Sequence, residues 1–253
     1  MRNIALLLQY KGTAYHGWQR QENALTVQEV VERALAKTLG EPCSVHGCGR
    51  TDAGVHAERY VCNFLSDTKI PDDRLAGALN HYLPSDIGVI GAQTTKQDFH
   101  AQYHIVRKRY RYIILNRHYG DVFLCDRVWH YRHTLDIDAM QSACLSFIGT
   151  HDFSAFCASG GSAREHTRTV YSLTCEKAGD LITIDICGNG FLYNMVRIIA
   201  GTLVYVGNGK IALQQVPGII ASGNRRLAGI TAPAQGLYMY RVYYDEKYGI
   251  AID

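Results

Sequence analysis

The residues best suited to chemistry lie between Gly47 and Ala57, where three glycines accompany an arginine and an aspartate. Glycines at this density indicate a tight backbone that another group must approach closely. Arg50 and Asp52 are two positions apart, and in an extended segment such residues point to the same side. A carboxylate and a guanidinium could then face one cleft. The same spacing also fits a turn in which Asp52 caps backbone amides and Arg50 lies on the surface.

Other common site patterns are missing from the sequence. None of the eight cysteines forms a C-x-x-C pair or a compact His/Cys set, so we expect neither a metal site nor a disulfide framework. A dinucleotide fingerprint would need glycine where Asp52 stands, and Gly209-Lys210 lacks the other residues of a P-loop. We therefore expect no cofactor. For the adjacent pair His151-Asp152, a loop and capping role is favoured over catalysis.

The segment GRTDAGVHA, residues 49–57, closely resembles the signature of the TruA family of tRNA pseudouridine synthases. Further segments that resemble this family follow in the same order along nearly the whole chain. They are residues 17–21, 26–28, 79–80, 83–84, 86–87, 99–101, 109–112, 151–153, 168–169, 190–192, 195–197, 232–233 and 236–238. The resemblance implies that Asp52 is the catalytic carboxylate of a uridine isomerase.

Pseudouridine formation breaks the C1′–N1 glycosidic bond, turns the uracil and joins its C5 to C1′. The reaction needs no redox change and no group donor, which agrees with the lack of a cofactor motif. A carboxylate can act as a nucleophile at C1′, or it can stabilise a glycal or oxocarbenium-like species. Both routes need an ionised Asp52, and a buried carboxylate tends to become neutral unless a cation pairs with it.

The resemblance also implies roles for other residues. Arg197 matches the arginine that pairs with the catalytic aspartate, and Arg50 matches one that helps to splay the target base from its helix. Tyr110 matches the tyrosine that stacks on this base, and Leu237 resembles an apolar residue of the same pocket. From the residues alone, Arg197 also fits a solvent-exposed helical position, and Tyr110 and Leu237 also fit the core.

Two positions depart from the family pattern. Lys11 stands where the family usually has an acidic residue, and Gln102 stands where it usually has arginine. The first departure adds positive charge and the second removes it. Neither lies in the catalytic motif, so both concern only the details of RNA contact.

A basic run with interleaved tyrosines is the clearest local cluster of charge, since the formal net charge of the chain is only +3. Alternation along a strand would place the three arginines on one face and the lysine with both tyrosines on the other. The pattern fits an ordinary solvated face, and it equally fits phosphate contact with stacking. The run comprises Arg107, Lys108, Arg109 and Arg111, with Tyr110 and Tyr112 between them.

Hydrophobic periodicity predicts the same order of elements, β-α-β-β-α-β, in each half of the chain. The first half should contain strand 4–10, a helix from the capping box at Thr26 to Gly40, strands 44–50 and 60–65, a helix from Pro71 through Tyr82, and strand 87–92. The second half should contain strand 110–115, a helix from Asp136 to Gly149, strands 170–175 and 181–187, a helix over 195–206, and strand 237–244.

These elements predict an α+β protein with the pseudouridine synthase fold. Two ferredoxin-like α+β halves, 1–105 and 106–253, would share a mixed, mainly antiparallel sheet with a central RNA-binding cleft. The first half would carry the loop of Asp52, and the second half would carry Tyr110 and Arg197. A length of 253 residues with 47% hydrophobic and 19% charged residues suits such a core.

The resemblance implies that the substrate is tRNA, at uridines 38, 39 and 40 of the anticodon stem-loop, and that the protein is a homodimer whose subunits both contact one tRNA. An RNA chaperone would keep the basic run without needing Asp52. A glycosidase would want a second carboxylate, for which Glu58 is nearest in sequence. Without a signal-peptide pattern or an apolar stretch of roughly 20 residues, we expect no membrane contact and a cytoplasmic location.

Overall fold

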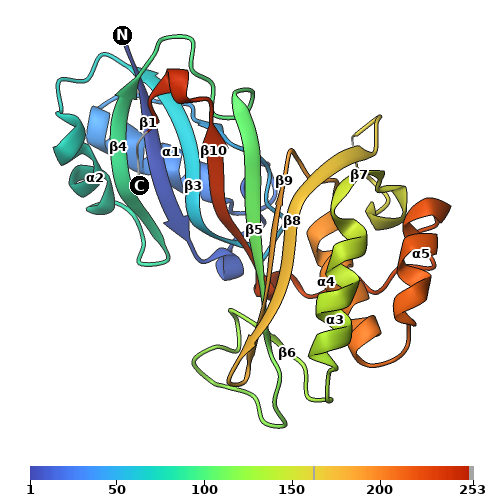
Figure 1. The fold of residues 1–253 in the computed structure, drawn as a ribbon. Helices are drawn as coiled ribbons and strands as arrows, with labels where there is room; N and C mark the ends of the chain where they lie inside the picture. Colours follow the sequence, from blue (N-terminus) through green and yellow to red (C-terminus); the bar gives the residue numbers. More distant parts are fainter. Residues whose placement is uncertain (162, 251–253) are drawn as a thin grey trace. The chain divides into compact units, whose positions relative to one another are not determined.

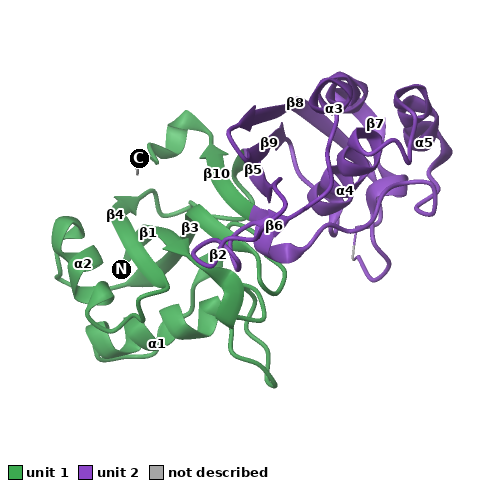
Figure 2. Cartoon of the chain, turned by 90° about the horizontal axis from the view of Figure 1, so that it is seen from below, with its two compact units in different colours: residues 1–106, 238–253 green, residues 107–237 purple. Residues whose placement is uncertain are grey.

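The computed structural model describes residues 1–161 and 163–250 (Figure 1). Their contacts divide the chain into two compact units (Figure 2). Unit 1 contains Met1–Val106 together with the chain from Tyr238 onward, and unit 2 contains Arg107–Leu237. The predicted halves ran from 1 to 105 and from 106 to 253, so the compact units differ from them mainly in the C-terminal segment, which returns to unit 1.

The sheet of unit 1 is built around β1 (Arg2–Tyr10) and β3 (His56–Ser66). Strand β1 pairs antiparallel with β3 on one side and with β4 (Ile87–Thr95) on the other. Two strands share the remaining edge of β3. Strand β10 (Leu237–Tyr244) runs parallel to the first residues of β3. Strand β2 (His46–Gly47) runs antiparallel to a later part of β3.

Helix α1 (Val27–Leu39) begins and ends as the sequence predicts. The Thr26 side chain accepts a hydrogen bond from the backbone N–H of Glu29, and Gly40 ends the helix in the left-handed conformation with φ of 80°. A side-chain acceptor at the N-cap satisfies one of the N–H groups that lack a partner within the helix, and glycine adopts positive φ without a steric penalty.

Helix α2 (Asp72–Asn80) follows Pro71 and packs along β4, on the same side of the sheet as α1 (Figure 1). Leu75 and Leu79 are buried on its inner face. The prediction that this helix extends through Tyr82 is wrong. The helix ends at Asn80, so helical periodicity no longer places Tyr82 inward, and its side chain is 45% exposed.

Unit 2 contains an antiparallel sheet covered by helices. Strand β9 (Leu181–Gly188) pairs with β5 (Ile105–Leu115) and β8 (Thr167–Ala178). Two short strands extend this arrangement, β6 (Trp129–His130) parallel to β5 and β7 (Gly149–Asp152) antiparallel to β8. The helices are α3 (Ile137–Cys144), α4 (Met195–Gly207) and α5 (Val216–Ser222), and α3 packs against both α4 and β8.

Helix α4 is buried on nearly all sides, which requires small residues at its closest contacts. A Cβ atom on Gly201 would lie 1.9 Å from the backbone oxygen of Ile230, and one on Gly207 would lie 2.8 Å from Sδ of Met140. These separations are shorter than real Cβ contacts. At Gly201 the backbone of α4 therefore approaches the backbone of Ile230 in a way that only glycine permits, whereas a Cβ atom on Gly207 would require the Met140 side chain to move.

The predicted α+β elements are present, with limited differences. The strand predicted over 44–50 is reduced to β2, because the glycine-rich segment after it forms a loop. The helix expected to continue to Gly149 ends at Cys144, and a single 3₁₀ turn, Leu145–Phe147, follows it. The sequence did not predict β6, β7 and α5, which are short and lack a long periodic pattern.

Candidate active site

Asp52 lies on the loop that joins β2 to β3 in unit 1. The backbone carbonyl of Asp52 accepts a hydrogen bond from the N–H of Val55 at 3.1 Å, and Gly54 has φ of 78°. These features define a tight turn that begins at Asp52. Asp52 is half-buried, whereas Arg50 is exposed.

The turn of Asp52 is held on both flanks by the last residue of β1 and by residues that follow this strand. The hydroxyls of Tyr10 and Thr51 are 2.9 Å apart and buried. The carbonyl of Thr51 accepts from the N–H of Trp18 at 3.2 Å, and Gly54 donates its N–H to the carbonyl of Tyr15 at 3.3 Å. Because these bonds fix the residues before and after Asp52, the carboxylate starts from a defined backbone position.

Two glycines allow this segment to contact the loop backbone directly. A Cβ atom on Gly12 would lie 2.0 Å from the carbonyl oxygen of Val55, and one on Gly17 would lie 2.2 Å from that of Thr51. The N–H of Gly12 also donates to Nδ1 of the buried His56 at 2.9 Å, so the proton of that neutral ring is on Nε2. No side chain larger than hydrogen fits at either glycine.

Three aromatic rings support the other side of the loop. The rings of Trp18 and Tyr60 stack with centroids 4.1 Å apart, and Tyr10 lies 5.6 Å from Tyr60. The Tyr60 hydroxyl donates to the carbonyl of Gly49 at 2.5 Å. Burial raises the pKa of Tyr60 well above its usual value, so this hydroxyl keeps its proton and remains a donor.

Arg197 lies in the first turn of α4 in unit 2, and its side chain is half-buried. Its Nε donates to the carbonyl of Ala232 and one terminal nitrogen donates to Oδ1 of Asn194, each at 2.7 Å. The N–H of Ala232 donates back to the carbonyl of Arg197 at 3.1 Å. These contacts hold the guanidinium in place. Arg197 is therefore not the freely solvated helical arginine that its sequence position also allowed.

Asn194 is in a sparsely populated backbone conformation. With φ of 59°, it is the only non-glycine residue with positive φ among the residues that the structure describes. Asparagine tolerates this region better than most residues, and such strain persists where the surroundings enforce it. In this conformation the Asn194 side chain accepts the hydrogen bond from Arg197.

Tyr110 and Leu237, predicted to line the base pocket, are both buried. Tyr110 pairs with Ile186 in the sheet, is 9% exposed, and meets Phe191 edge-to-face with centroids 5.2 Å apart. Leu237 begins β10 and is 6% exposed. This burial is compatible both with core packing and with a pocket that opens for a base.

The basic run on β5 alternates as predicted, and one face of it is partly neutralised. Arg109 and Arg111 both contact Oδ2 of Asp185 on β9, at 3.3 and 3.0 Å. Arg111 also donates through Nε to Oδ1 at 3.2 Å. Arg107 is exposed at the start of the run and Lys108 is half-buried. Because one carboxylate serves two guanidinium groups, this face keeps a net positive charge that is smaller than the sequence suggests.

The structure thus groups the predicted residues by unit. Arg50 and Asp52 lie on one loop of unit 1, while Tyr110, Arg197 and the basic run lie in unit 2. Sequence reasoning missed the supporting residues Tyr10 and Thr51 as well as Asn194. The only signal in the sequence for this support was the presence of Gly12 and Gly17 shortly after a buried strand, since glycines there indicate a close backbone contact.

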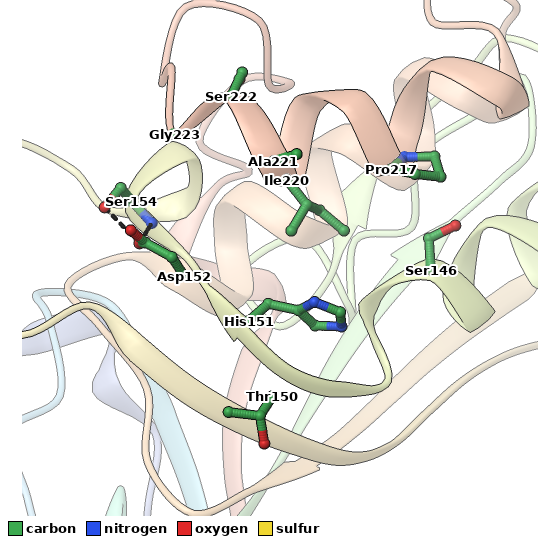
Figure 3. Close-up of a pocket in the computed structure, with 10 residues that line it drawn as sticks. All are labelled: Ser146, Thr150, His151, Asp152, Ser154, Pro217, Ile220, Ala221, Ser222 and Gly223. Atoms are coloured by element: carbon green, nitrogen blue, oxygen red, sulfur yellow. Dashed lines mark hydrogen bonds between the residues drawn. The ribbon is translucent and has the colours of Figure 1, made fainter.

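A cavity of about 680 Å³ in unit 2 contains none of the predicted catalytic residues (Figure 3). Its wall includes Asp152, whose Oδ1 accepts from the backbone N–H of Ser154 at 2.8 Å and from its hydroxyl at 2.6 Å. These bonds lower the pKa of Asp152. The Ser154 hydroxyl donates its proton to a carboxylate, so Nδ1 of His166, 2.8 Å away, does not activate it as a nucleophile. This agrees with the predicted capping role of Asp152.

Across residues 1–161 and 163–250, no three His, Cys, Asp or Glu side chains are grouped so that they could hold a metal ion. In the same part of the chain, no helix has the length and apolar character needed to cross a membrane.

Comparison with known families gives a match over most of the chain. A family model described as tRNA pseudouridine synthase matches residues 7–104 and 143–245. The first segment contains the loop of Asp52 with its supports Tyr10 and Trp18, and the second contains Arg197 with Asn194. The match therefore includes both parts of the structure that hold a candidate catalytic group.

Three curated relatives named tRNA pseudouridine synthase A are similar along almost their whole length. The protein of Thermoanaerobacter sp. (strain X514) is 52% identical over 244 residues, which cover 96% of this chain and 100% of the relative. The protein of Acetivibrio thermocellus is 49% identical, with the same coverage. That of Citrifermentans bemidjiense is 46% identical over 98% of this chain and 99% of its own.

Replacing Gly17 by alanine tests the close backbone contact at the loop. Gly40→Ala is the matched control, because Gly40 has nearly the same φ, 80° against 81°, but no atom within 4 Å of the new Cβ. We expect Gly40→Ala to lower the free energy of unfolding by about 1–2 kcal/mol through backbone strain alone. Gly17→Ala should cost about 1–3 kcal/mol more through overpacking.

Chemical denaturation measures the loss of unfolding free energy in each variant, and amide hydrogen exchange shows which part of the structure is destabilised. Exchange at Trp18 and Gly54 should accelerate in Gly17→Ala and remain unchanged in Gly40→Ala. Equal destabilisation with equal exchange in both variants would show that the close contact does not constrain the loop.

Proposed function

The chain belongs to the family of tRNA pseudouridine synthases, and from this premise we propose that Asp52 is the carboxylate with which it isomerises uridines 38, 39 and 40 of the anticodon stem-loop. The family match over most of the chain supports the enzyme class, an isomerase that converts uridine in tRNA to pseudouridine. The single observation that carries the proposal for Asp52 is the rigid support of its turn by Tyr10, Trp18 and Tyr15.

The reaction conserves composition. The C1′–N1 bond breaks, the uracil rotates, and C5 bonds to C1′; C5 then loses its proton while N1 gains one. Asp52 would contribute either by attacking C1′ or by stabilising positive charge at this carbon as the bond breaks. Both roles favour a carboxylate with little freedom to move, because a misplacement of about 1 Å can cost 100-fold in rate.

We propose that Arg197 keeps Asp52 ionised. A guanidinium carries five N–H donors, so two can orient the side chain against Ala232 and Asn194 while others donate to a carboxylate. A cation beside a partly buried carboxyl lowers its pKa and favours the charged form. The resemblance of residues 195–197 to the family pattern supports this pairing.

The target uridine must leave its stack to be isomerised, and we propose that Tyr110 replaces the lost stacking. Stacking on an aromatic side chain is worth about 1–3 kcal/mol per base, which is comparable with the cost of unstacking. The edge-to-face contact with Phe191 would hold the ring of Tyr110 in one orientation. Exposed Arg50 would help to splay the base, and Leu237 would line its pocket.

Phosphate contacts would come mainly from the start of the basic run. Arg107 is the strongest candidate because it is exposed, and the half-buried Lys108 is the next. Arg109 and Arg111 share Asp185, which lowers the net charge that they can offer to phosphate. Serving three adjacent uridines favours reading of shape and backbone over reading of sequence.

We also propose that the protein acts as a homodimer. Val122 and Phe123 offer apolar surface for such a contact, since their side chains are 82% and 80% exposed in a loop of unit 2. Large exposed apolar side chains that lie close together commonly mark protein contacts. The dimer and the cytoplasmic location both stay predictions.

Asp52→Asn tests the catalytic proposal, because asparagine keeps the shape of aspartate and removes its charge. Pseudouridine formation in an unmodified anticodon stem-loop should fall by roughly 10⁴-fold or more, as for other essential catalytic groups. The affinity for tRNA should remain. Asp73→Asn, an exposed change in α2, is the control and should leave both unchanged.

Rival functions give different results in this experiment. An RNA chaperone would show no pseudouridine in the wild-type protein and no effect of Asp52→Asn. A glycosidase that used Glu58 would release free base, and Glu58→Gln would abolish this release.

Two substitutions at Asn194 test the orientation of Arg197. Asn194→Gly keeps the left-handed backbone but removes the acceptor for the guanidinium, so kcat should fall by about 10- to 100-fold at nearly constant tRNA affinity. Asn194→Asp keeps an acceptor and should stay within a few-fold of wild type. Single-turnover kinetics and tRNA binding separate the two effects, and equal kinetics for both variants would contradict this role.

The salt dependence of tRNA binding tests the basic run. The logarithm of affinity should fall linearly with the logarithm of salt concentration, and Arg107→Gln should reduce the magnitude of this slope by about 0.7–0.9. Lys177→Gln, which removes an exposed cation from β8, should leave the slope as it is. An unchanged slope in Arg107→Gln would remove Arg107 from the phosphate contacts.

A further inference from the structure

Three aromatic rings gather on the surface of unit 1, and none of them belongs to the loop of Asp52 or to the aromatic rings that support it. His46 lies on β2, and His100 and Tyr103 lie on the turn between β4 and β5. The ring of His100 has its centroid 4.7 Å from that of His46 and 4.2 Å from that of Tyr103, with interplanar angles of 33° and 30°. His46 is exposed and Tyr103 is 73% exposed. We name these three rings the histidine–tyrosine stack.

One buried asparagine brings the two segments of the stack together. His46 is the register partner of Asn63 on β3. The side chain of Asn63 accepts from the N–H of Ala101 at 2.9 Å and donates to the carbonyl of Phe99 at 3.3 Å. The turn is therefore bonded to the strand residue that lies directly opposite His46.

Further contacts fix the base of the turn. The Tyr244 hydroxyl donates to the carbonyl of Ala101 at 2.7 Å. Phe99 is buried and packs against Tyr244 and Tyr248, with centroids 5.0 and 5.4 Å away. The exposed ring of Tyr103 thus projects from a rigid turn, so ordering it for binding should cost little conformational entropy.

The central ring of the stack is neutral. Nδ1 of His100 accepts a hydrogen bond from the N–H of Gln102 at 3.1 Å, which places its proton on Nε2. Burial lowers the pKa of His100, and the neighbouring imidazoles of His46 and His104 lower it further. A neutral ring in contact with an exposed tyrosine offers π surface for stacking without an ion pair.

We propose that the histidine–tyrosine stack is a second RNA contact, which stacks on an unpaired nucleobase of tRNA other than the uridine that reacts. The identity of the RNA rests on the function proposed above. Every base has a π face, and unpaired bases of loops commonly stack on aromatic side chains. Along β3, Asn63 beside the stack lies about 23 Å from His56 beside the Asp52 loop, at roughly 3.3 Å per residue. This separation suits a different nucleotide.

The composition of the surface favours RNA over a protein partner. Imidazole nitrogens and a phenol hydroxyl border the rings, and the neighbouring Gln102 is polar and exposed. The core of a protein interface is usually larger and more apolar than such a cluster. A contact with a second copy of the chain is therefore the alternative that the experiment must detect.

Tyr103→Ala tests the proposal in the full chain. The dissociation constant for an unmodified tRNA transcript should rise about 5- to 150-fold, the range expected for loss of one stacked base. Tyr103→Phe keeps the ring and should bind like wild type. Tyr82→Ala removes another exposed tyrosine of unit 1 and is the control, which should bind tRNA like wild type. Thermal unfolding should be unchanged, because the Tyr103 side chain is 73% exposed.

Two further readouts separate stacking from other causes. The slope of affinity against salt should be the same in Tyr103→Ala and wild type, since tyrosine carries no charge that releases counterions. Sedimentation should show an unchanged oligomeric state.

The proposal is overturned if Tyr103→Ala binds tRNA within twofold of wild type, or if it changes the oligomeric state. Absence of pseudouridine from the wild-type reaction would instead overturn the proposed function, and the affinity comparison would still decide whether the stack binds RNA.

Discussion

Direct contact between two backbone segments is the constraint on which the candidate site depends. The segment after β1 lies so close to the loop of Asp52 that Gly12 and Gly17 cannot carry a side chain. The hydrogen bonds that Thr51 shares with Trp18 and Tyr10 then fix the loop beside its aspartate. A catalytic carboxylate on a loop would otherwise move with that loop, so its position must be fixed by packing against the segment that follows β1, a strand paired on both sides.

Each unit fixes its own candidate catalytic group by a different means. In unit 1, backbone contacts hold the loop and leave the carboxylate of Asp52 at its tip. In unit 2, side-chain and carbonyl acceptors from Asn194 and Ala232 hold the guanidinium of Arg197 directly. A long, flexible arginine needs contacts near its end, because a fixed backbone alone leaves several rotatable bonds. Asp52 has a short side chain, so fixing the backbone is nearly sufficient.

Local signals in the sequence predicted most of the fold, whereas the candidate site was inferred from family resemblance. The capping box at Thr26 and the alternation along β9 depend on neighbouring residues, so they could be read directly. Asp185 could not be assigned to Arg109 and Arg111, because strand pairing joins positions that are distant in sequence. Likewise, nothing local indicated that Asn194 would adopt positive φ or that His46 would meet His100. These features arise from tertiary packing, which periodicity does not encode.

The shared edge of β3 has a consequence for synthesis on the ribosome. Strand β2 covers the later part of this edge soon after translation, but the first part waits for β10, which is made near the end. Until then, the nascent chain presents unpaired backbone groups on a central strand, and such edges can pair with other chains. Completion of the first unit is thus delayed until the second has emerged, which makes aggregation during translation a hazard that chaperones would relieve.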